Sequence, residues 1–146
     1  MFKRILVPTD GTDLSLKAVA TAAGLAQTFG AELVGVTVVE PYSYSGMSEY
    51  HPETPDAFET RNAQIANERL RKFSDAVQSA GVKAEMLTER SFTPFEAIIG
   101  AAKRKQCDLI VMASHGRRGL AGVLLGSETL KVMIHGEIPV LVYRRP

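Results

Sequence analysis

A glycine-rich stretch in the last third of the chain has the composition of a phosphate-binding loop. It follows an apolar run, residues 109–112, and leads into Ser127, where side chains begin to recur at helical spacing. Glycine lets a backbone approach a ligand closely, and the first turn of a helix offers N–H groups and the positive end of its dipole. The stretch therefore predicts an anion site. Its glycines are Gly116, Gly119, Gly122 and Gly126.

The stretch matches neither of two common nucleotide-binding motifs. No lysine precedes Ser127, so it is not G-x-x-x-x-G-K-[ST], and its glycine spacing is not G-x-G-x-x-G. Arg117 and Arg118 could pair with phosphate oxygens, or they could be solvated loop residues. Ser127 could likewise be an ordinary helix cap or a phosphate contact, because both roles use the same N–H groups.

A second polar cluster follows the first apolar strand, at Pro8, Thr9 and Asp10. Asp10 is a candidate carboxylate for a nucleoside or for Mg²⁺ bound to a nucleotide; the alternative is an Asx turn with its own backbone. Pro8 and Thr9 would shape the wall beside it. Val39, which ends the second apolar strand, could contact a base through its backbone or could be a core residue.

Efficient catalysis is not expected from these residues. Ser114 and His115 could form a nucleophilic arrangement with Asp10, but there is no G-x-S-x-G elbow and no evident general base at a γ-phosphate position. No group of His, Cys, Asp and Glu has metal-ligand spacing in the sequence.

The elements that must position these residues alternate between strand and helix. This order predicts an α/β sandwich with a five-stranded parallel sheet and helices on both faces. The strand order 3-2-1-4-5 is preferred over 2-1-3-4-5, because it brings residues 8–13 and 113–126 to one crevice at the carboxyl ends of strands one and four. The expected strands are 2–9, 33–39, 82–89, 108–113 and 139–143, and the expected helices are 14–29, with Thr12 or Asp13 as its N-cap, 57–80, 94–106 and 127–135.

Several local details follow from the same patterns. Thr93, with proline after it and Glu96 at the third helical position, predicts a capped helix start. The third strand is expected near an edge of the sheet, with Val82, Ala84, Met86 and Leu87 on its buried side. Residues 40–56 have no periodicity; their tyrosines could form a lid over a base, lie in an interface or be disordered. The expected buried faces of the first two helices are Leu14, Ala18, Ala22, Leu25 and Phe29, and Phe58, Ile65, Leu70, Phe73, Val77 and Ala80.

Composition places the chain among ordinary globular domains. Its 146 residues, 45% hydrophobic and 23% charged, predict one domain over 1–146. A net charge of +1 gives no reason to expect nucleic-acid binding, and no apolar run is long enough to span a membrane. The single cysteine, Cys107, excludes an intrachain disulfide, is expected to serve packing, and suits the cytoplasm.

The chain resembles the universal stress protein family over essentially its whole length. Ile5 to Thr12 looks like the first strand and aspartate-bearing loop of the family, and Ile138 to Val142 looks like its final strand. The nucleotide signature of the family is Gly, two residues, Gly, nine residues, Gly and Ser or Thr. It falls here on Ala113, Gly116, Gly126 and Ser127, so alanine replaces the first glycine.

The resemblance implies an ATP-binding stress-response or regulatory protein with little or no catalytic turnover. It also implies a homodimer formed by antiparallel pairing of the last strands, Pro139 to Tyr143, with a state that depends on ATP. If Ala113 had a positive φ, its side chain would cost about 1 kcal/mol. The alternatives are a scaffold that acts through protein partners and a slow nucleotide hydrolase using Asp10 and a metal. The expected nucleotide contacts are Pro8, Thr9, Asp10, Val39, Ala113, His115, Gly116, Arg117, Gly126, Ser127, Glu128 and Thr129.

Overall fold

The computed structural model describes residues 1–43, 53–116 and 125–145. Arg117, Arg118, Gly119, Gly122 and the tyrosines at 44 and 50 lie outside these ranges, so the predictions made for them are not addressed by the structure. Its elements are β1 (Arg4–Pro8), α1 (Asp13–Phe29), β2 (Glu32–Val39), α2 (Pro55–Gln78), β3 (Ala84–Arg90), α3 (Pro94–Arg104), β4 (Leu109–Ala113), α4 (Ser127–His135) and β5 (Val140–Tyr143).

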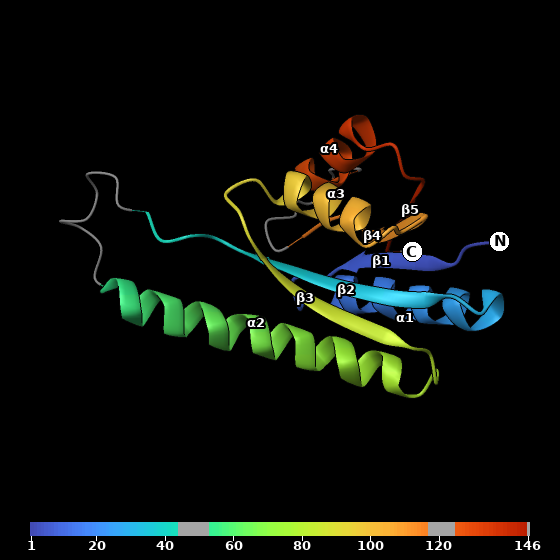
Figure 1. The fold of residues 1–146 in the computed structure, drawn as a ribbon, viewed down its shortest axis with the longest axis horizontal. Coiled ribbons are helices and arrows are strands. Elements are labelled where there is room, and N and C mark those ends of the chain that lie inside the picture. The colour runs from blue at the N-terminus through green and yellow to red at the C-terminus, as the bar shows by residue number, and fades with distance from the viewer. Residues whose placement is uncertain (44–52, 117–124, 146) are drawn as a thin grey trace.

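The five strands form one parallel sheet in the order β3-β2-β1-β4-β5, which confirms the predicted order. Helices α1 and α2 cover one face, and α3 and α4 cover the other (Figure 1). The three apolar residues of β1 show why both faces need helices: Ile5 and Val7 belong to the core beneath α1 and α2, and Leu6 belongs to the core beneath α3 and α4. A strand with apolar side chains at consecutive positions is stable only when both of its faces are buried.

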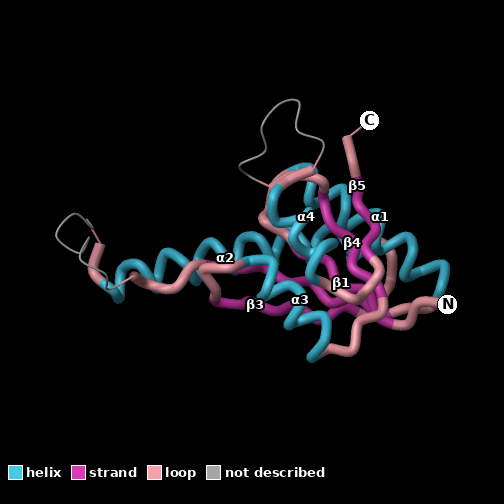
Figure 2. The backbone as a smooth tube through the Cα atoms, turned by 90° about the horizontal axis from the view of Figure 1, so that it is seen from above, coloured by secondary structure: helices cyan, strands magenta, loops and turns pink. Residues whose placement is uncertain are grey.

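Helix α2 is held on the sheet by close packing against a glycine. A Cβ atom at Gly35 would lie 2.7 Å from the ring of Phe73, so the absence of a side chain lets the ring rest on β2. The helix starts two residues earlier than predicted, because Thr54 Oγ1 accepts the N–H of Ala57 (3.1 Å) and Pro55 occupies the first turn. Its N-terminal turns extend past the ends of most of the strands (Figures 1 and 2).

The structure corrects several predicted details of burial. Met86 is 44% exposed, because β3 is an edge strand with a neighbour on one side only. Phe29 is 38% exposed at the end of α1 and makes an edge-on contact with Phe2 instead of entering the core. In α2, Ile65 and Leu70 are half-buried, whereas Phe58, Phe73 and Val77 are buried as predicted.

The start of α3 also differs from the prediction. The Thr93 side chain makes no capping bond, because the main-chain N–H of Thr93 donates to Ser91 Oγ (2.9 Å) and holds the residue at a φ of −124° and a ψ of 83°. In the part of the chain that the structure describes, no helix is long and apolar enough to cross a membrane.

Candidate functional site

The loop after β1 is shaped by hydrogen bonds among its own residues. Asp10 Oδ1 accepts the N–H of Thr12 (3.0 Å) and the Thr12 hydroxyl (2.6 Å), which is the Asx turn considered from the sequence. The buried Thr9 hydroxyl accepts the N–H of Gly11 (3.2 Å), whose φ of 77° suits glycine. Thr12 Oγ1 in turn caps α1 by accepting the N–H of Ser15 (3.3 Å). The position of the Asp10 carboxylate is therefore set by the loop itself.

The end of β4 is tied to the start of α4. The carbonyl of Ala113 accepts the Thr129 hydroxyl (2.9 Å), and the carbonyl of Ser114 accepts the N–H of Gly126 (2.6 Å). A Cβ atom at Gly126 would lie 3.1 Å from the Ser114 oxygen and 3.4 Å from the His115 Cα. Because Gly126 has a φ of −67°, glycine is needed here for close approach and not for a left-handed backbone.

Ala113 introduces no backbone strain. It is the last residue of β4, it is buried, and it is absent from the residues with positive φ, of which Gln106 is the only non-glycine in the described ranges. The cost of about 1 kcal/mol expected for alanine at positive φ therefore does not apply.

The loops after β1 and β4 meet, as the strand order requires. Strands β1 and β4 are direct neighbours, with Ile5 opposite Leu109 and Leu6 opposite Ile110. A Cβ atom at Gly116 would lie 3.1 Å from Asp10 Oδ2, so the second glycine of the signature adjoins the aspartate. We call residues 8–12, 113–116 and 125–129 the β1–β4 site. It contains every expected nucleotide contact within the described residues except Val39.

Helix α4 starts at this site without a side-chain cap. Its N-cap residue is Gly126, whereas α1 and α2 are capped by threonine hydroxyls. Leu130 is the first residue of α4 whose N–H has a helical acceptor: it donates to the Gly126 carbonyl (3.0 Å). The N–H groups of the three residues before it, 127–129, have no acceptor within the helix. Together with the helix dipole they form a place for an anion.

Glu128 has a structural role that the sequence did not reveal. Its Oε2 accepts the main-chain N–H of Phe95 (2.9 Å), so the carboxylate caps the start of α3 in place of Thr93. Its Oε1 lies 3.6 Å from Lys131 Nζ. The glutamate was expected among the nucleotide contacts; the structure directs its side chain to α3, and a contact through its main chain stays a prediction.

Ser114 and His115 are directly bonded to each other. Ser114 Oγ lies 3.0 Å from His115 Nδ1, and His115 Nε2 is buried with no hydrogen-bond partner in residues 1–43, 53–116 and 125–145. In the same ranges no group of three or more His, Cys, Asp and Glu side chains could hold a metal ion.

The end of β2 presents a different residue from the one expected. Val36 accepts the N–H of Thr9 (2.8 Å) and so faces β1, whereas Val39 accepts the N–H of Ser91 (3.0 Å) and so faces the β3 side. Backbone groups alternate along a strand, so the N–H and carbonyl of Val38 face the same side as those of Val36. Since β1 ends opposite Val36, Val38 faces the β1–β4 site beyond the end of β1. Val38 is therefore a further candidate for base contact through the backbone, and the contact expected at Val39 stays a prediction.

Fold and site together define a doubly wound α/β domain whose candidate ligand site lies at the carboxyl ends of its central strands. The model of the universal stress protein family matches residues 1–144. The chain belongs to the universal stress protein family.

Similar proteins extend over nearly the whole chain. A universal stress protein of Methanocaldococcus jannaschii, MJ0531, is 35% identical over 149 residues, which cover all of this chain and 84% of the relative. The protein YxiE of Bacillus subtilis is 36% identical over 154 residues, with coverage of 99% and 100%. The solved structure of MJ0577 superposes with a TM-score of 0.83 at 25% identity and covers 100% of this chain and 98% of that one. A universal stress protein solved in complex with cAMP superposes with a TM-score of 0.72 at 27% identity, with coverage of 97% and 96%.

Proposed function

We propose that this protein binds an adenine nucleotide, ATP with Mg²⁺, at the β1–β4 site and acts as a regulatory stress-response protein. The observation that supports the proposal is the geometry at the start of α4. Its glycine N-cap lies within hydrogen-bond distance of Ser114, and its first N–H groups have no acceptor within the helix. The functional unit proposed is the whole chain, residues 1–146.

The phosphates would bind at the start of α4. The N–H groups of Ser127, Glu128 and Thr129 would donate to phosphate oxygens, and the helix dipole would add a favourable charge interaction. Asp10, held beside Gly116, would contact the ribose or a nucleotide-bound Mg²⁺. Arg117 is proposed as an additional phosphate contact by its place in the sequence.

The adenine would bind at the end of β2. The N–H and the carbonyl of Val38 face the site, and this donor–acceptor pair matches the N1 acceptor and the 6-amino donor of adenine. The similar structure in complex with cAMP, also an adenine nucleotide, supports the same ligand class.

The proposed working form is a cytoplasmic homodimer with little or no turnover of ATP. Strand β5 is an edge of the sheet, and its Leu141 is 36% exposed. Exposed Leu130, Met133 and Ile134 of α4 add further apolar surface on the element that follows β4. An edge strand with exposed apolar side chains favours pairing with a second copy. The dimer would depend on ATP occupancy, because α4 carries both the phosphate contacts and this apolar surface.

The test is to identify any nucleotide extracted from the purified protein and then to titrate ATP, with and without Mg²⁺, while thermal unfolding is followed. Ligand at 100 times its Kd stabilises a folded protein by about 2.7 kcal/mol. For a domain of this size that raises Tm by roughly 5–10 °C. Gly126→Val should abolish the shift, because any Cβ there meets the Ser114 carbonyl; Gly24→Val, where a Cβ meets nothing within 4 Å, is the control.

The outcomes separate the three candidate functions. The absence of any shift at millimolar ATP would refute nucleotide binding and leave a scaffold that works through protein partners. Rapid release of ADP would instead support a metal-dependent nucleotide hydrolase. A Gly126→Val variant that binds ATP as well as the unchanged protein would place the site elsewhere on the molecule.

A further inference from the structure

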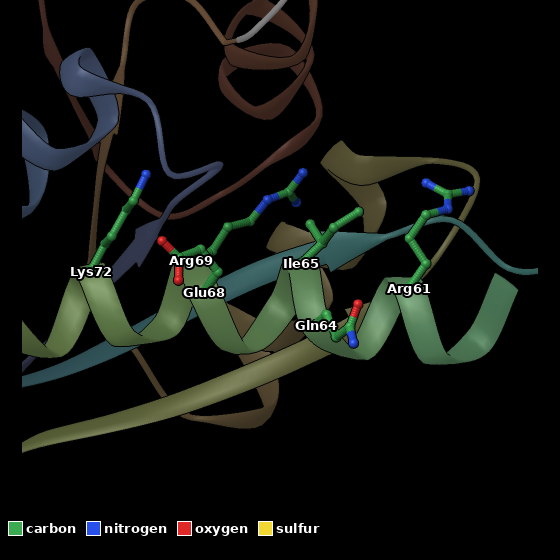
Figure 3. Close-up of a pocket in the computed structure, with 6 residues that line it drawn as sticks. All are labelled: Arg61, Gln64, Ile65, Glu68, Arg69 and Lys72. Carbon is green, nitrogen blue, oxygen red and sulfur yellow. The ribbon is translucent and has the colours of Figure 1, made fainter. Parts of the chain in front are cut away.

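Arg69 connects α2 to the edge of β2 that faces the β1–β4 site. One guanidinium nitrogen, Nη1, donates to the Val38 carbonyl (3.1 Å) and lies 3.2 Å from the hydroxyl of the fully buried Thr37. Figure 3 shows Arg69 extending from the same side of α2 as Arg61, Ile65 and Lys72, and these residues border an open depression of about 260 Å³. Arg69 therefore uses one of the two lone pairs of the acceptor that the proposed base contact requires.

The next carbonyl on the same side of β2 is held by α2 as well. Asn62 Nδ2 donates to the Glu40 carbonyl (2.8 Å), and the Asn62 side chain is buried. Asn62 and Arg69 lie two turns apart on α2, so one face of the helix holds two alternate carbonyls at the end of β2. The two donors differ in their surroundings, because the Asn62 side chain is buried whereas Arg69 is partly exposed, with its Nε buried.

The bond from Arg69 changes which base the end of β2 recognises. With the Val38 carbonyl open, the strand offers one acceptor to the 6-amino group of adenine. With Arg69 in place, the same position offers an N–H donor, because a guanidinium has several donors and no acceptor. A donor opposes the amino group of adenine and suits the 6-oxo group of hypoxanthine or guanine. The N1–H of these 6-oxopurines opposes the Val38 N–H with or without Arg69, so Arg69 changes only the contact at the 6-position.

We propose that Arg69 sets the base selectivity of the nucleotide site by covering the Val38 carbonyl and so lowering the preference for adenine over 6-oxopurines. Adenine must share this carbonyl with Arg69 and brings its amino group beside the guanidinium donor, whereas a 6-oxopurine accepts a hydrogen bond from Arg69. The inference rests on the proposed nucleotide-binding function. The charge-assisted hydrogen bond from Arg69 to a 6-oxo group changes the ratio of the two affinities by about tenfold.

The experiment compares the affinities of ATP and inosine triphosphate, which carry a 6-amino and a 6-oxo group respectively. Both are measured by calorimetry on the unchanged protein and on Arg69→Met, which keeps an unbranched side chain without donors. The ratio of ATP affinity to inosine triphosphate affinity should rise about tenfold in the variant, because the amino group no longer shares its acceptor with a cation and the donor for the oxo group is lost. A change in stability alone would weaken both nucleotides together and leave the ratio unaltered.

Arg71→Met is the matched control. Arg71 lies on the same helix and pairs with Glu68 and Asp75 at the surface, so its loss should not change the ratio. An unchanged ratio in Arg69→Met, with both nucleotides still bound, would overturn the role of Arg69 and leave the proposed function intact. Failure of the unchanged protein to bind either nucleotide would overturn both proposals. A ratio that rises equally in both variants would show a general charge effect and would also overturn the role of Arg69.

Discussion

Replacing Gly126 by alanine adds one methyl group where the start of α4 lies against the end of β4. The new Cβ would lie 3.1 Å from the Ser114 carbonyl oxygen and 3.4 Å from the His115 Cα, so main-chain atoms must move by a few tenths of an ångström. The backbone of Gly126, with a φ of −67° and a ψ of 155°, is open to alanine, so the cost is one of contact only.

The change in the free energy of unfolding of Gly126→Ala has two destabilising contributions and one stabilising contribution. Lengthening the bond from the Gly126 N–H to the Ser114 carbonyl costs about 1 kcal/mol, and alanine is a poorer N-cap than glycine by about 0.5 kcal/mol. Alanine also lowers the conformational entropy of the unfolded chain, which stabilises the folded protein by about 0.5 kcal/mol. The free energy of unfolding should therefore fall by about 1 kcal/mol, which lowers Tm by roughly 2–4 °C for a chain of this length.

The assay is urea unfolding of Gly126→Ala beside Gly24→Ala. Gly24 lies within α1, where a Cβ meets nothing within 4 Å, so alanine there should stabilise the protein by about 0.5–1 kcal/mol. ATP affinity should fall about tenfold in Gly126→Ala, because the N–H groups at the start of α4 shift, and should not change in Gly24→Ala. If both variants gain stability to the same extent, the close approach of α4 to β4 is refuted.

Three further changes test other parts of the structure. Ala113→Gly should leave ATP affinity within about threefold and lower stability by about 0.5–1 kcal/mol, since the residue has an ordinary strand backbone; a large gain in affinity would contradict this. Hydrogen bonds from Lys83 and Arg4 hold the pKa of Glu32 below its ordinary value of 4.5, so its stabilising contribution is present above that pH and is lost as pH falls through the lower folded pKa. Glu32→Gln should accordingly be less stable than the unchanged protein at pH 7 by urea unfolding, and the difference should shrink as pH falls below 4.5. Burial raises the pKa of Cys107 to about 11, so a disulfide reagent at pH 8 should modify it only as fast as the protein unfolds; rapid reaction of the native protein would show that the thiol is accessible.

The fold was predictable because its signals are local. Apolar runs with flanking glycine, proline and threonine mark the elements, and helix α4 begins at Ser127 and ends at His135 as the sequence predicts. The strand order followed from the composition of the loops, because ligand-binding loops of a parallel sheet gather where the order reverses. The strand expected over 2–9 is shorter in the structure, Arg4–Pro8, because a strand extends only as far as its backbone pairs with a neighbour, and composition does not show where that pairing ends.

The side-chain contacts around the β1–β4 site were not predictable from local sequence patterns. The amino-acid sequence by itself determined the α/β class and the order of the elements, because periodicity and turn residues act over a few positions. The meeting of Asp10 with the glycine signature was predicted from the strand order that the loop compositions favoured. Only the tertiary structure decided that Glu128 caps α3, 33 residues away, and that Arg69 covers the Val38 carbonyl, 31 residues away. Each of these bonds depends on the angle at which a helix packs on the sheet. The residues next to a long polar side chain in the sequence do not indicate which distant group it will contact.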